Sequence, residues 1–102
     1  MELAEIRSTL TIPLYWTFHL EDVERFEGLS DREIEEVRRH FGREEFGALV
    51  EALAWAQAHP EEDYSSMLPR LDFPNAVLHR YLAVLHRQFE KEWVKWLGSG
   101  EM

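Results

Sequence analysis

The feature that most constrains the fold is a long run of regularly spaced apolar residues near the C-terminal end of the chain. Between residues 74 and 97, large apolar side chains recur at steps of three and four, close to the 3.6 residues of one α-helical turn. A second apolar strip lies about a third of a turn away and widens the surface to be buried. We therefore expect a helix over 74–97 that is central in a bundle or shared with a partner subunit. The two strips are Leu78, Leu82, Leu85, Phe89, Trp93 and Trp96, and Val77, Tyr81 and Val84.

Capping and stop signals predict further helices before this one. Ser30 and Glu33 have the spacing of a capping box, in which each side chain accepts a hydrogen bond from the other residue's backbone amide. A helix is predicted over 31–41, because Gly42 stands where helices commonly end in a left-handed residue. Another helix is predicted over 44–58, where a strip of alanines would allow a second helix to approach closely.

The N-terminal region has a different periodicity. From residue 6 to residue 20 the even positions are mostly large and apolar and the odd positions mostly polar, which is typical of a strand with one buried face. Pro13 cannot donate a ladder hydrogen bond and indicates an edge, a bulge or a break between two shorter strands. Without a second strand of this quality or an Asn-Gly turn, we favour pairing with the same strand of another subunit over a hairpin. This predicts a homodimer.

The predicted fold class is therefore mainly α (α+β). It is a bundle of three or four helices with an N-terminal β-strand or hairpin, and 1–102 forms a single compact domain. The fourth helix is a short segment over 61–68, which follows Pro60 and is closed by Pro69.

Composition limits the chemistry and the location. A hydrophobic content of 45% with four tryptophans indicates a folded protein. The chain has no cysteine, which excludes disulfides, thiolate metal sites and a cysteine nucleophile, and favours the cytoplasm. The acidic start does not resemble a signal peptide, and no apolar run approaches the ~20 residues of a membrane span.

Charge is distributed unevenly along the chain. Residues 1–63 hold sixteen acidic and six basic residues, a net charge of −10, whereas residues 64–102 have a net charge of +1. An acidic body repels phosphate and attracts basic proteins at long range. A basic protein partner is therefore predicted, and nucleic acid is disfavoured.

No catalytic or cofactor motif has the required spacing. Ser65 and Ser66 lack an activating GxSxG or SxxK context, and the scattered glycines form neither a P-loop nor a dinucleotide fingerprint. His79, His86 and Glu90 share a helical sector, but the two histidines are about 10 Å apart along the axis, too far to ligate one metal ion. We predict a protein that is not an enzyme and has no metal or cofactor.

The favoured function is a small acidic protein-binding module. In size and charge the chain resembles the nuclease-immunity proteins, which are small acidic helical inhibitors, and this resemblance implies an inhibitor or accessory factor of the kind carried by mobile elements. Acidic side chains are expected to steer the partner toward an aromatic anchor. The predicted partner-binding residues are Glu21, Asp22, Glu24, Glu35, Glu36, Glu44, Glu45, Trp55 and Tyr64.

The alternative function is DNA-binding transcriptional regulation. The segment RSTLTIPL, followed by two helices that meet at a glycine, resembles the ribbon-helix-helix repressors, whose paired strands enter the DNA groove. The resemblance implies a dimer that reads DNA with its N-terminal strands. A basic strip of the last helix, formed by Arg80, Arg87, Lys91 and Lys95, is a second candidate surface for phosphates.

Overall fold

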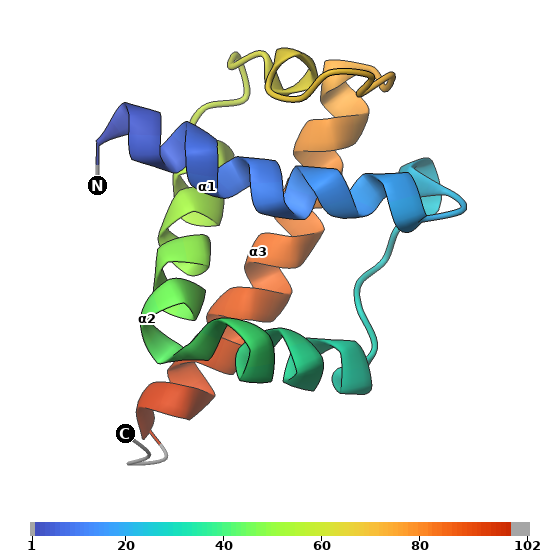
Figure 1. Ribbon diagram of the computed structural model, residues 1–102. Coiled ribbons are helices and arrows are strands. Elements are labelled where there is room, and N and C mark those ends of the chain that lie inside the picture. Colours follow the sequence, from blue (N-terminus) through green and yellow to red (C-terminus); the bar gives the residue numbers. More distant parts are fainter. Residues whose placement is uncertain (1, 99–102) are drawn as a thin grey trace.

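The computed structural model describes residues 2–98 and shows a bundle of helices (Figure 1). No strand is present between residues 2 and 98. The helical bundle predicted from the sequence is thus confirmed, and the N-terminal strand or hairpin is wrong. The elements in chain order are α1 (Leu3–Tyr15), η1 (Trp16–His19), η2 (Val23–Arg25), α2 (Asp31–Ala58), η3 (Tyr64–Ser66) and α3 (Asn75–Gly98).

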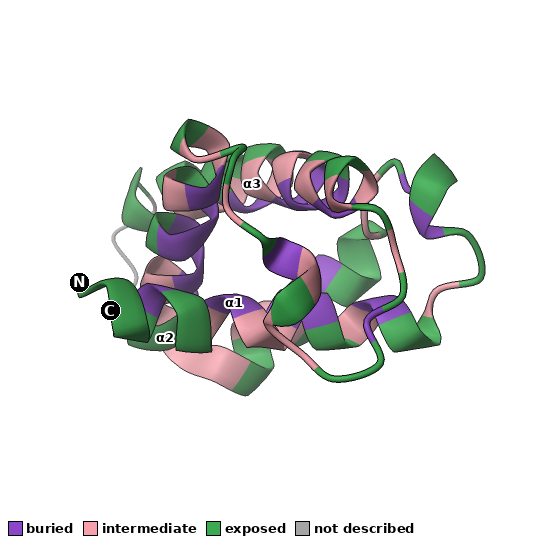
Figure 2. Cartoon of the chain, turned by 90° about the horizontal axis from the view of Figure 1, so that it is seen from above, coloured by how far each residue is buried: buried purple, intermediate pink, exposed green. Residues whose placement is uncertain are grey.

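The three long helices enclose one core. The second half of α2 and α3 run along each other, and α1 crosses both of them on one side (Figure 1). Viewed from above, the buried residues lie on the inner faces of all three helices (Figure 2). The helix predicted over 74–97 is the central one, because α3 contacts η2 and η3 as well as α2.

The region predicted as a strand is helical because its apolar residues are spaced by four. Ile6, Leu10 and Leu14 are buried, and a step of four fits one face of a helix as well as the even positions of a strand. Ser8, which the alternating pattern places on the buried face, is exposed. The helical period therefore decides which residues are buried.

The helical N-terminus removes the structural argument for a dimer. A helix satisfies its own backbone groups, so α1 needs no strand from another subunit. Pro13 lies inside α1 near its end, and its carbonyl accepts a hydrogen bond of 2.7 Å from the buried hydroxyl of Tyr81 on α3. This contact ties the end of α1 to the central helix.

The capping box and the break in α2 are both present. The Ser30 hydroxyl accepts from the Glu33 amide at 3.2 Å, and the Glu33 carboxylate accepts from the Ser30 amide at 3.0 Å. Gly42 has φ 73° and ψ 175°, so the helix turns sharply there. The predicted helices 31–41 and 44–58 are the two halves of α2 on either side of this turn.

The helix predicted over 61–68 is only the short turn η3. Its first residue, Tyr64, is fully buried, and its hydroxyl donates to the carbonyls of His59 at 2.6 Å and Ala56 at 3.1 Å. Asn75 accepts from the Tyr64 amide at 2.8 Å and donates to the Glu62 carbonyl at 2.8 Å. These bonds satisfy backbone groups after the end of α2 and fix the segment in an irregular path.

Aromatic side chains fill the core between α2 and α3. Phe46 stacks on Phe89, with ring centroids 5.1 Å apart, and also contacts Trp93 and Trp96 at 6.2 and 5.6 Å. Gly47 allows this approach, because a Cβ atom there would lie 2.9 Å from the Trp93 ring. The two helices are therefore in close contact at the level of these rings.

The turn at Gly42 can be tested by adding a methyl group. Its φ and ψ fall in a region that is essentially restricted to glycine, so Gly42→Ala is expected to cost about 1–3 kcal/mol of unfolding free energy. Among residues 2–98, no other side chain lies within 4 Å of an added Cβ at Gly42 or at Gly98, and Gly98 lacks the positive φ. Gly98→Ala is therefore the matched control in denaturant unfolding. Equal stability of the two variants would contradict the conclusion that the backbone at position 42 requires glycine.

The buried tyrosines predict a loss of stability in alkali. Burial, together with the nearby carboxylates of Glu62 and Glu61, raises the pKa of Tyr64 to about 12, and burial also raises the pKa of Tyr81. Folding favours the neutral phenols, so this stabilisation is complete below the unfolded pKa of about 10 and is lost as the pH rises through the folded values.

Denaturant unfolding across this pH range measures the effect. Tyr64→Phe should flatten the alkaline decline and lower the unfolding free energy at neutral pH by about 1–2 kcal/mol, because two carbonyls lose their donor. Tyr15→Phe, at a ring that is 56% exposed, is the control and should keep the wild-type profile. An unchanged profile in Tyr64→Phe would argue against this coupling.

Candidate binding groove

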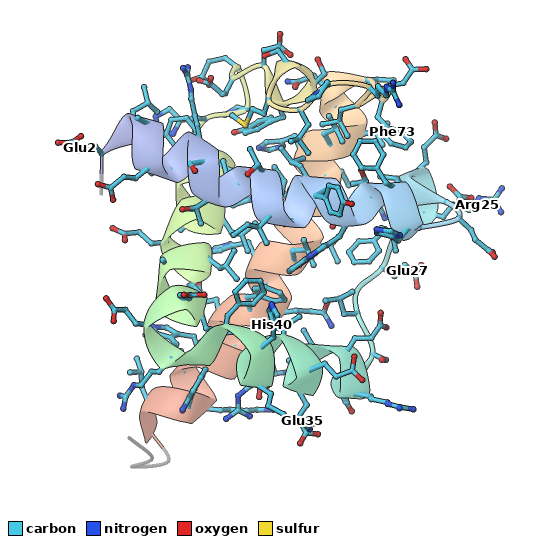
Figure 3. All side chains as sticks on the ribbon, in the orientation of Figure 1. Glu2, Arg25, Glu27, Glu35, His40 and Phe73 are labelled. Atoms are coloured by element: carbon cyan, nitrogen blue, oxygen red, sulfur yellow. The ribbon has the colours of Figure 1, made fainter. Side chains whose placement is uncertain are left out.

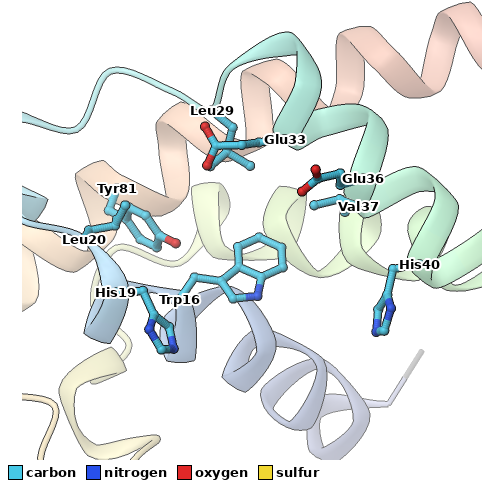
Figure 4. A pocket seen from close by; sticks show the side chains of 9 residues that line it. All are labelled: Trp16, His19, Leu20, Leu29, Glu33, Glu36, Val37, His40 and Tyr81. Carbon is cyan, nitrogen blue, oxygen red and sulfur yellow. The ribbon is translucent and has the colours of Figure 1, made fainter.

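A groove of about 500 Å³ lies between η1 and the first half of α2 (Figure 4). Its walls are apolar. Trp16 and Leu20 come from the η1 side, Leu29 and Val37 come from the other side, and Tyr81 of α3 closes the back. Apolar concave sites with a few polar groups at the edge are the usual form of a binding site in a folded domain.

The rim of the groove is formed by ionisable side chains. Glu33, Glu36 and His40 follow one another at steps of three and four, so they share one face of α2 with Val37. His19 stands on the opposite wall. Two carboxylates beside an apolar wall make this edge of the groove acidic.

Trp16 is held in place by aromatic contacts with the core. Its ring centroid lies 6.1 Å from Phe89 of α3 and 6.5 Å from Phe41 of α2. The next residue, Thr17, is buried and donates to the Leu14 carbonyl at 2.7 Å, which continues the chain tightly from α1 into η1. The indole therefore forms a fixed wall that is still partly accessible from the groove.

The opposite wall depends on one side chain of α3. Gln88 accepts from the Leu29 amide at 2.7 Å and donates to the Leu29 carbonyl at 2.8 Å. Gly28 makes room for this amide, because a Cβ atom there would lie 2.7 Å from the Gln88 Oε1. Arg80 donates to the carbonyls of Glu24 and Phe26 at 3.1 and 3.0 Å. The loop between η2 and α2 is thus fixed to α3 by side-chain bonds to its backbone.

Of the predicted partner-binding residues, Glu36 alone lines the groove. Its carboxylate lies 3.4 Å from the exposed guanidinium of Arg32. Glu35 is on the other side of α2 from His40 (Figure 3) and is paired with Arg39 at 3.3 Å. Adjacent positions on a helix point in different directions, so the two carboxylates serve different surfaces.

The remaining predicted carboxylate residues are exposed, and none of them lines the groove. Asp22 accepts from the Arg25 amide at 3.3 Å and begins η2. Glu21 precedes it in the chain, and Glu24 lies within η2. Glu44 and Glu45 follow the turn at Gly42, on the second half of α2.

The two predicted aromatic anchors have structural roles. Tyr64 is fully buried, so no partner can contact it without unfolding the segment around η3. Trp55 is half-buried and stacks on His59, with ring centroids 4.0 Å apart and planes 13° apart. Neither side chain belongs to the groove.

The groove contains residues that the sequence did not single out for binding. Trp16, His19 and Leu20 fall in the region that the sequence predicts as a strand, and Leu29 lies in a loop without a motif. His40 could have been found from its spacing to Glu33 and Glu36 on one helix face. No pattern in the sequence indicates that this face of α2 lies opposite η1.

The histidines considered as metal ligands have other partners. The Nε2 atom of His79 lies 3.1 Å from the Ala56 carbonyl, and that of His86 lies 2.8 Å from the Glu90 carboxylate. Among residues 2–98, no group of three or more metal-ligating side chains is close enough to hold an ion. In the same part of the chain, no helix combines the length and apolar character needed to cross a membrane.

Comparisons of the chain with protein-family models, curated proteins and solved structures find no match.

Substitution of Gln88 is expected to lower the stability of the protein and to loosen the groove wall at Leu29. Gln88→Met keeps the approximate size of the side chain but removes both the acceptor of the Leu29 amide and the donor to the Leu29 carbonyl. The expected cost is about 1–3 kcal/mol of unfolding free energy, with faster hydrogen exchange at the Leu29 amide. Thermal unfolding and amide exchange measured by NMR test both effects. Wild-type exchange at Leu29 would show that Gln88 does not hold this wall.

Proposed function

We propose that the protein is a non-enzymatic binding module that takes a segment of a basic protein into the groove between η1 and α2. The observation that supports this most directly is the pairing of an apolar interior with an acidic rim. Trp16 and Val37 offer apolar surface, and Glu33 and Glu36 stand beside it. An apolar side chain flanked by lysine or arginine has the complementary chemistry.

The form of the groove suits long basic side chains. Lysine and arginine bury their aliphatic stems on apolar surface while their charged ends stay at the edge. In this groove the stem would pack on Trp16 or Leu29, and the cation would reach Glu33 or Glu36. Arginine can also stack on an indole face, which gives Trp16 a second mode of contact.

The charge of the whole chain supports the same partner. A net charge of −9 attracts basic proteins at long range and raises their rate of encounter. If the bound segment belongs to the functional surface of the partner, the module would act as an inhibitor or accessory factor, of the kind expected for small mobile-element proteins. The absence of cysteine suits action in the cytoplasm.

The structure weakens the basis of the DNA-binding alternative. The N-terminal strands that would enter the DNA groove are replaced by α1. Arg80 is bonded to the loop before α2, and Lys91 and Lys95 line a shallow hollow together with Asp31 and Glu35. The basic strip therefore lies beside the protein's own carboxylates.

Synthetic amphipathic peptides test the proposed function. The probe is a helical peptide with leucines on one face and lysines on the other, and the control peptide has glutamates in place of the lysines. Isothermal titration calorimetry should show binding of the lysine peptide, weakened by salt, and none of the glutamate peptide.

Two charge reversals locate the site. Glu36→Lys is expected to weaken binding by roughly tenfold or more, because it places a cation on the rim. Glu45→Lys changes the net charge equally on the second half of α2 and should have little effect. Equal weakening by both variants would indicate attraction to the whole acidic chain and contradict a defined groove.

A further inference from the structure

Two aromatic side chains beside the groove are unusually exposed. Tyr15 is 56% and Phe18 is 44% exposed, and their rings meet edge to face with centroids 5.7 Å apart. Clustered exposed aromatic side chains commonly mark protein interaction sites. We call Tyr15 and Phe18 the aromatic patch.

A second hollow lies next to this patch. It has a volume of about 310 Å³ and is lined by Thr11, Ile12, Tyr15, Trp16 and Leu68. None of these side chains is charged. Its surface thus differs from the groove, where two carboxylates stand on the rim.

The hollow and the groove adjoin each other at two residues. Trp16 lines both of them. The ring of Tyr15 also contacts the ring of His19, with centroids 5.6 Å apart, and His19 stands on the groove wall. Apolar and aromatic surface therefore extends from Val37 across Trp16 to Leu68.

We propose that the groove and the second hollow bind one continuous segment of the basic partner, with one apolar side chain in each hollow on either side of Trp16. The basic residues of the segment flank only the side chain in the groove. The side chain in the second hollow has neutral neighbours and packs against the aromatic patch. This inference rests on the proposed function and adds a second anchor and a direction.

Charge complementarity supports this occupant. The lining of the second hollow offers no carboxylate to a lysine, and Glu62 and Asp63 of the adjoining hollow, which shares Thr11, are already bonded to Arg7 and Ser65. Lysines beside the groove reach Glu33 and Glu36. The difference between the two hollows therefore fixes which end of the segment lies where.

Other exposed apolar residues offer controls rather than competing sites. Leu3 is 46% exposed at the opposite end of α1, and Val94 is 62% exposed among Arg87, Lys91 and Lys95. Neither lines the groove or the second hollow.

The test uses synthetic peptides with two leucine anchors at a series of spacings, lysines around the first anchor, and serine and glutamine around the second. In the matched one-anchor peptides, serine replaces the second leucine. At the best spacing, the two-anchor peptide should bind the wild-type protein roughly tenfold more tightly than its one-anchor partner.

Protein variants assign this gain to the second hollow. Tyr15→Ser, at a residue that lines the second hollow, should abolish the tenfold difference between the two peptides, whereas Leu3→Ser, at an exposed residue outside both hollows, should keep it. A nitroxide on the lysine-free end should broaden the amide signals of Thr11 and Leu68 more strongly than those of Val37 and His40. The reverse pattern would overturn the proposed direction.

The outcomes separate the two proposals. If both peptides bind equally and Glu36→Lys weakens both, the two-anchor inference fails and the groove remains a binding site. If neither peptide binds at any spacing, the proposed function fails as well. Self-association of the wild-type protein in sedimentation that is lost in Tyr15→Ser would assign the patch to a second copy of this chain and overturn the inference.

Discussion

The sharp turn of α2 at Gly42 is the constraint on which the rest of the structure depends. A straight helix of this length would place all of α2 along α3. Because the backbone turns at a φ of 73°, the second half of α2 runs along α3, while the first half crosses α3 and pairs with it through Arg38 and Glu92 (Figure 1). The groove lies between η1 and the first half of α2, so its position depends on this change of direction. A glycine at which an added Cβ atom would meet no described side chain thus determines where the groove lies.

The central helix α3 connects this turn to the rest of the groove. Three of its side chains reach three separate segments. Tyr81 bonds to Pro13 at the end of α1, Gln88 holds Leu29, and the ring of Phe89 supports Trp16. These residues lie within about two turns of one another, so the same short stretch of α3 positions both walls of the groove. Stability and site geometry are therefore coupled, and a substitution on the buried face of α3 affects both.

Local signals in the sequence were sufficient where the structure depends on local chemistry. The apolar periodicity of α3, the capping box at Ser30 and the turn at Gly42 each require only neighbouring residues. The N-terminal helix was missed because a spacing of four is shared by a helical face and by alternate positions of a strand. The groove could not be predicted, since Leu29 and its partner Gln88 are 59 residues apart. Tyr64 was predicted as an exposed anchor and is a buried residue that bonds to backbone carbonyls, because the sequence alone does not distinguish these two roles of a tyrosine.

The availability of the acidic rim follows from where the protein's own cations are placed. Arg38 pairs with Glu92 at 2.9 Å in a half-buried setting, and Arg7 reaches Glu62 from a distant helix. At the groove, Glu36 has Arg32, whose side chain is 89% exposed and one helical turn away at 3.4 Å. Such a pair contributes only about 0.3–0.5 kcal/mol, so replacing it with a cation from a partner costs little. A rim carboxylate held this weakly is ready to exchange partners, whereas a carboxylate in the Arg38 pair is already committed to the fold.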